Sequence, residues 1–85
     1  MSVRVTIETA SKAEAEMLAK ELPGQLEAHS WRGLGVIRLA AKSRQETQEL
    51  IQAVSRGFHE HGLRWARVRY DDEEYVLRAN SQPAA

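Results

Sequence analysis

The chain has 85 residues, with 12 Lys and Arg against 12 Asp and Glu, 42% hydrophobic residues and no cysteine. This length suffices for one domain, since two domains of half the size would each bury too small a core. The cancelling charges exclude a globally basic chain that coats nucleic acid or an anionic membrane by charge alone. The lack of cysteine excludes disulfides, thiolate nucleophiles and cysteine-bound metal centres.

The chain begins with the patterns of a strand and a helix. Residues 3–8 alternate apolar and polar side chains, which is the period of a strand with one buried face. Ser11 and Glu14 have the spacing of a capping box, in which each side chain satisfies a free backbone N–H at a helix start. We expect this helix to end at Pro23 and Gly24, because that pair terminates helices strongly.

Two strands and a second helix are expected next. Residues 26–31 and 36–41 have strand character, and the glycines within residues 32–35 permit a tight reversal between them. Residues 43–46 repeat the capping box, and an apolar stripe on the following turns predicts an amphipathic helix. This helix should end at Gly62.

The C-terminal part predicts a hairpin. Residues 63–70 and 74–78 read as strands, with a turn at the acidic residues 71–72. Residues 80–85 are small or polar and include a proline, so we expect a flexible tail there. The sequence therefore predicts a single domain over residues 1–79.

The element order predicts an α+β fold of the βαββαββ type. The chain also resembles itself at a shift that places Ser11 on Ser43, as two βαβ units would. We expect a ferredoxin-like βαββαβ two-layer sandwich with an additional C-terminal β-strand, both helices lying on one face of a mainly antiparallel sheet. The strand order should be 4-1-3-2, with the fifth strand beside the fourth. In the alternative fold, the C-terminal hairpin does not pair beside the first strand.

Such a sheet leaves one face free of helices, and this open face is the natural place for function. Strand alternation predicts which side chains point outward. The resulting candidate interaction face consists of Arg4, His29, Trp31, Val36, Arg38, Trp65, Arg67 and Arg69. In the alternative interpretation one or both tryptophans belong to the core.

One segment is similar to a nucleic-acid-binding motif. Residues 32–39 are similar to the RNP1 segment of RNA-recognition motifs, which combines a basic residue and glycine with three aromatic positions. Those positions hold Leu34, Val36 and Leu39, and Arg4 stands where the companion segment has a ring. The resemblance does not assign the family, and RNA binding stays an alternative.

The sequence offers no catalytic or metal-binding frame. His59 and His61 are two residues apart on a helix, so their rings diverge, and capping of the helix end explains them better. The acidic residues 71–74 lack the glycine and spacing of a calcium loop. His29, with Glu27 on the same face, is the one candidate general base. We expect no enzyme activity, cofactor or metal.

These observations favour a small non-catalytic protein-interaction or regulatory module. We expect it to self-associate through an open face too apolar to stay uncovered, so its partner would be a protein, including a second copy of itself. RNA or single-stranded nucleic-acid binding through the Trp and Arg face is the second hypothesis, and small-molecule sensing is the third. The apolar runs are too short to cross a bilayer, and no signal-peptide pattern is present, so we expect a cytoplasmic protein without a membrane partner.

Overall fold

The computed structural model describes residues 2–24 and 26–79. The tail predicted at residues 80–85 lies outside the described residues. The elements, in chain order, are β1 (Val3–Thr9), α1 (Lys12–Glu21), β2 (His29–Trp31), β3 (Leu34–Ala41), α2 (Arg44–His61), β4 (Trp65–Tyr70) and β5 (Glu73–Arg78).

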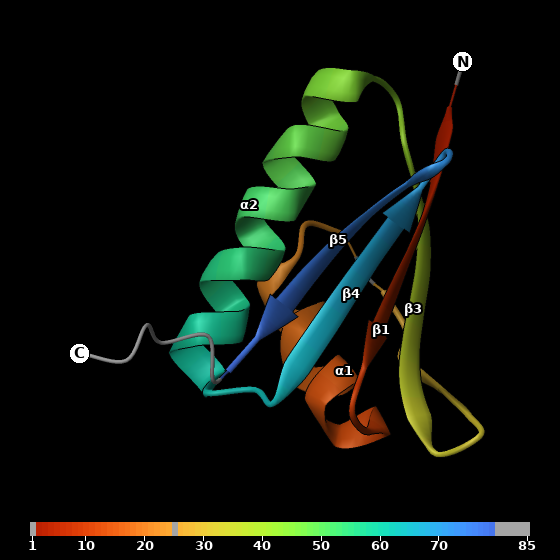
Figure 1. Ribbon diagram of the computed structural model, residues 1–85. Coiled ribbons are helices and arrows are strands. Elements are labelled where there is room, and N and C mark those ends of the chain that lie inside the picture. The colour runs from red at the N-terminus through yellow and green to blue at the C-terminus, as the bar shows by residue number, and fades with distance from the viewer. Residues whose placement is uncertain (1, 25, 80–85) are drawn as a thin grey trace.

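The strands form one five-stranded antiparallel sheet in the order β2-β3-β1-β4-β5. β1 lies between β3 and β4, and β5 pairs with β4, which is the placement that the sequence predicted. Figure 1 shows both helices on the same side of the sheet. α1 packs against β1 and β3, and α2 contacts α1, β1, β3 and β4. The chain is therefore α+β, with an arrangement compatible with a two-layer sandwich.

Both helices begin at the predicted caps, although only one half of each capping box forms. The Ser11 hydroxyl accepts a hydrogen bond from the Glu14 N–H at 3.3 Å, and Ser43 accepts one from Glu46 at 3.1 Å. The Glu14 carboxylate does not return to its own cap. It accepts from the backbone N–H of Arg64 at 3.2 Å and from the Arg64 Nε at 2.8 Å. This carboxylate therefore ties the start of α1 to the approach to β4.

The turn between β2 and β3 is tighter than the sequence predicted. Arg32 and Gly33 both have positive φ angles, of 50° and 83°, and such a pair forms the two-residue turn that matches strand twist. Pairing therefore resumes at once, with Trp31 opposite Leu34. β3 therefore begins at Leu34, two residues before the start that the sequence predicts.

Two predicted strands are shorter than expected at their N-terminal ends. Only the last three residues of the predicted strand 26–31 pair with β3. Leu26 and Ala28 instead pack, partly buried, against the core. Leu63 is buried as well, but β4 begins only at Trp65. Apolar side chains near a strand can thus serve the core without joining the ladder.

The core lies between the helix layer and the inner face of the sheet. Its members come from alternate positions of β1, β3 and β4 and from the facing stripes of α1 and α2. The largest completely buried apolar side chains are Phe58, Ile7, Leu18, Ile37, Val5, Val54 and Val68.

Gly35 in β3 passes closely beneath the start of α1. A Cβ atom at this position would lie 2.5 Å from the Thr9 Oγ1 and 2.7 Å from the Ala15 Cβ, and closer still to the Ser11 carbonyl oxygen. Backbone atoms cannot move aside as a flexible side chain does. The packing of α1 on β3 therefore requires glycine here.

Replacing Gly35 with alanine should lower the free energy of unfolding by at least about 2 kcal/mol, because β3 or α1 must shift. Gly57→Ala is the matched control. Its Cβ would lie 3.0 Å from the movable Leu18 Cδ2, and alanine gains about 1 kcal/mol of helix propensity. Urea unfolding followed by circular dichroism measures both. Equal losses in the two variants would contradict the close approach at Gly35.

Candidate functional site

The sheet face away from the helices is the candidate binding surface, and strand register determines which side chains it carries. Across β3, β1 and β4, Arg38, Thr6 and Arg69 lie directly opposite one another. Ala66 and Val68 are completely buried on the other face of β4. The predicted outward direction of Trp65, Arg67 and Arg69 on β4 therefore agrees with the burial of their neighbours.

This open face contains a shallow depression of about 700 Å³. Five of the predicted interaction residues line it: Arg4, Trp31, Val36, Arg38 and Arg69. The other residues that line it are Ser2, Thr6, Glu8, Tyr70 and Asp71. The parity of β1 could have assigned Thr6 and Glu8 to this site from the sequence. Alternation would place Tyr70 on the other face, since it lies opposite the buried Val5 and packs partly against the core, and Asp71 lies in the turn beyond β4.

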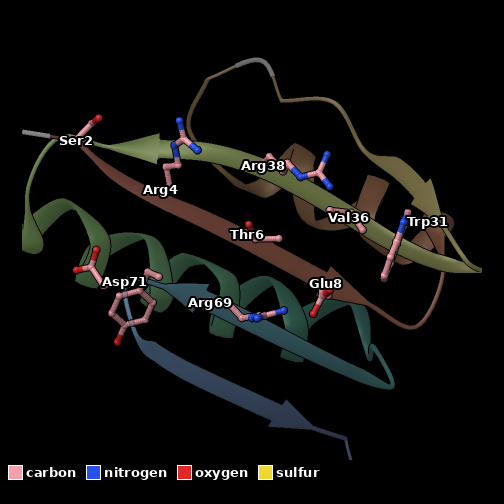
Figure 2. Close-up of a pocket in the computed structure, with 10 residues that line it drawn as sticks. Ser2, Arg4, Thr6, Glu8, Trp31, Val36, Arg38, Arg69 and Asp71 are labelled. Atoms are coloured by element: carbon pink, nitrogen blue, oxygen red, sulfur yellow. The ribbon is translucent and has the colours of Figure 1, made fainter.

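Three arginines of this depression, Arg4, Arg38 and Arg69, form what we call the arginine cluster. Figure 2 shows them around Thr6, with Trp31 at the other end of the depression. Among residues 2–24 and 26–79, no ion pair within 4.0 Å involves any of the three. The cluster thus brings three positive charges together without a direct ion-pair partner among the described residues, in a chain of zero formal net charge.

Arg67 is on the same face but has a different part in the structure. Its Nε lies 2.7 Å from the Glu8 Oε1, and a terminal nitrogen lies 3.5 Å from the Glu74 Oε1. The Glu8 side chain is only 7% exposed, and a buried carboxylate left without a partner is costly. The ion pair links β1 to β4 and, through Glu74, to β5. Arg67 is therefore engaged within the fold.

The two tryptophans lie on separate parts of the open face. Trp31 is 50% exposed, and the Arg32 guanidinium carbon lies 4.9 Å from the centre of its ring. Trp65 is half-buried and lines a second depression, of about 740 Å³, together with Arg67 and β5 residues. Strands β3 and β1 separate the two rings. Neither ring belongs to the buried core cluster.

The first depression is mixed in character, because Trp31, Val36 and Tyr70 line it beside charged and polar side chains, and Val36 is only 3% exposed. His29 pairs with Val36, which agrees with its predicted place on the open-face side of β2. It is not among the residues that line this depression and lines a different one, which also includes Lys12.

The histidines at the end of α2 also differ from their predicted use. The last carbonyls accept bonds from the backbone, with the Gly62 N–H 3.3 Å from the His59 oxygen and the Leu63 N–H 3.1 Å from the Phe58 oxygen. The His61 ring instead lies 3.0 Å from the Glu21 carboxylate and joins the two helices. Within the described part of the chain, no group of three potential ligands could hold a metal ion.

Comparison of the chain with protein-family models, curated proteins and solved structures gave no match. No helix among the described residues is both long enough and apolar enough to span a membrane.

Removing Arg67 should destabilise the fold, whereas removing Arg69 should not. Arg67→Met leaves the buried Glu8 carboxylate unpaired, which should cost about 2 kcal/mol, below the range for completely buried pairs because Arg67 is partly exposed. Arg69→Met, on the same strand and face, should change stability by less than about 0.5 kcal/mol. Adding Glu8→Gln to Arg67→Met should recover part of the loss. Urea unfolding tests all three, and equal stability of the two arginine variants would refute a structural ion pair.

Proposed function

We propose that this chain is a small non-catalytic interaction module that pairs with a second copy of itself through the free edge of β5. The observation that carries this proposal is an edge strand six residues long that pairs on one side only among residues 2–24 and 26–79, and on which Tyr75 and Val76 are 41% and 43% exposed. Long, exposed edge strands pair readily with other chains unless charge, proline or a bulge prevents it.

The outer edge of β5 carries backbone N–H and C=O groups that can pair with a second strand. The Ala79 N–H bonds to the Arg64 carbonyl oxygen, so odd-numbered residues near this end of the hairpin direct their backbone groups to β4. Because the direction alternates along a strand, Glu74, Val76 and Arg78 direct theirs to the open edge. A second strand could therefore form a regular ladder with these three residues.

Symmetry selects a register that also matches the side chains. An antiparallel pair of identical strands has its twofold axis normal to the sheet, so residues of the same parity lie opposite each other. If Val76 lies on the axis, Glu74 of each copy faces Arg78 of the other. Tyr75 then faces Leu77 on the opposite side of the sheet. Opposite charges and paired apolar side chains both stabilise neighbouring strands.

Other self-association surfaces are less favourable. Pairing through the centre of the open face would bring two arginine clusters together, and the like charges would repel. The opposite sheet edge, β2, is only three residues long.

A catalytic function of the open face has little support. The Glu8 carboxylate would be a candidate general acid or base, but its Oε1 lies 2.7 Å from the Arg67 Nε and is engaged in an ion pair.

We also propose that the fold is of the ferredoxin-like type, with β5 as the added strand. Support for this comes from the central position of β1 and from the two helices on one face. The added strand then has a function of its own, because it replaces the β4 edge with one suited to self-pairing. A cytoplasmic location stays a prediction from the sequence.

A charge-reversal experiment tests the register. The proposed dimer contains two Glu74–Arg78 pairs related by the twofold axis. Arg78→Glu turns both into pairs of glutamates, and Glu74→Lys turns both into pairs of a lysine with an arginine. Each variant alone should dimerise about 2- to 30-fold more weakly than the wild type, since two cross-strand pairs are lost and each contributes about 0.2–1 kcal/mol. An equimolar mixture of the two variants restores both attractive pairs and should form heterodimers. Sedimentation velocity measures all of these states.

The matched control is Arg56→Glu, on an exposed position of α2, which should leave dimerisation unchanged. A wild-type monomer at high micromolar concentration would refute self-pairing. A wild-type dimer that both variants leave intact would refute the β5 edge as its interface.

A further inference from the structure

The arginine cluster stands apart from the other arginines that lie near carboxylates. Arg64 lies 2.8 Å from Glu14, and Arg67 lies 2.7 Å from Glu8. The cluster arginines form no such pairs among the described residues. Since Glu8 is already neutralised by Arg67, the depression keeps an excess of positive charge that an anionic ligand would complement.

Register gives the cluster a defined geometry. Arg38 and Arg69 lie opposite Thr6 from either side, so their Cα atoms are roughly 10 Å apart, or two strand spacings. Arg4 precedes Thr6 by two residues on the same face of β1, at roughly 7 Å. Guanidinium groups bind phosphate oxygens through paired N–H donors, and the Thr6 hydroxyl adds a further donor. Several phosphates could therefore be bound across these strands.

Trp31 adds an aromatic surface to the same depression. Arg32 lies over one face of the ring, and the ring is half exposed at the end of the depression opposite Arg4 (Figure 2). Trp31 pairs with Leu34, which precedes Arg38 by four residues, or roughly 13 Å along β3. The stacking surface and the cations are thus spread along the sheet.

We propose that this depression binds a short segment of single-stranded nucleic acid, with one base on Trp31 and the following phosphates on the arginine cluster. This site goes beyond the self-association proposed above and uses none of the β5 residues. An aromatic platform followed by a line of cations is the combination by which proteins bind single strands. The depression lies on an open sheet face, where an extended strand can lie across it, whereas small-molecule sites enclose most of their ligand.

Asp71 limits the length of the site. It lines the same depression as Arg4 and follows Tyr70, the last residue of β4. Further acidic residues follow at the hairpin tip. A polyanion that continued past Arg4 would meet these like charges, so we expect a site of only a few nucleotides.

Fluorescence anisotropy of a fluorescein-labelled uridine octanucleotide with the full chain tests this proposal. Three phosphate contacts should weaken binding by about 20-fold between ~50 and ~200 mM salt. Arg38→Ala and Arg69→Ala should each lower the affinity and lower the slope against salt by about 0.7. Trp31→Leu should weaken binding by at least about 5-fold, through the loss of stacking.

Arg56→Ala is the matched control, because it removes an exposed arginine from the helix layer and should bind as the wild type does. Circular dichroism confirms that each variant is folded. Since Arg38 and Arg69 are exposed on different strands, either variant suffices if the other fails to fold.

Three results would overturn the proposal. The first is no binding at ~50 mM salt, where three phosphate contacts are strongest. The second is binding that neither Arg38→Ala nor Arg69→Ala weakens. The third is equal affinity for ATP or for a glutamate-rich peptide, since these would identify the ligand as a free nucleotide or an acidic protein segment.

Discussion

The uneven cover of the sheet is the constraint on which the rest of this structure depends. Both helices pack on one face, so no second layer of the fold covers the outward side chains of β1, β3 and β4. The sheet must therefore be stable with this face open. The ion pair between Glu8 and Arg67 contributes to this, because it joins neighbouring strands on the uncovered side. The arginine cluster of that face forms no ion pair with the described carboxylates, so the fold does not depend on it in this way.

Local sequence patterns were sufficient for the elements and for the direction of most side chains. The alternation of residues 3–8 and the serine caps at Ser11 and Ser43 identified β1 and both helix starts correctly. Contacts between distant residues could not be predicted in the same way. The pair of Glu14 with Arg64 spans 50 residues, and it depends on how α1 and β4 are placed in space. The separation of the two tryptophans by β3 and β1 likewise depends on the strand order and not on any local pattern.

The two proposed surfaces are compatible with each other. A twofold axis normal to the sheet places the open faces of both copies on the same side, so a dimer paired through β5 would present two arginine clusters on one continuous sheet. The acidic residues of the β4–β5 hairpins repel a polyanion, so each cluster would bind its own short segment of nucleic acid.

Amide hydrogen exchange along β5 tests the central claim of self-pairing most directly. In a monomer, the N–H groups of Glu74, Val76 and Arg78 point to solvent, so they should exchange quickly at any concentration. In the proposed dimer the same groups bond to the second copy. We predict that their protection rises as the protein concentration is raised from low micromolar to millimolar. Fast exchange of these three amides throughout that range would contradict the account.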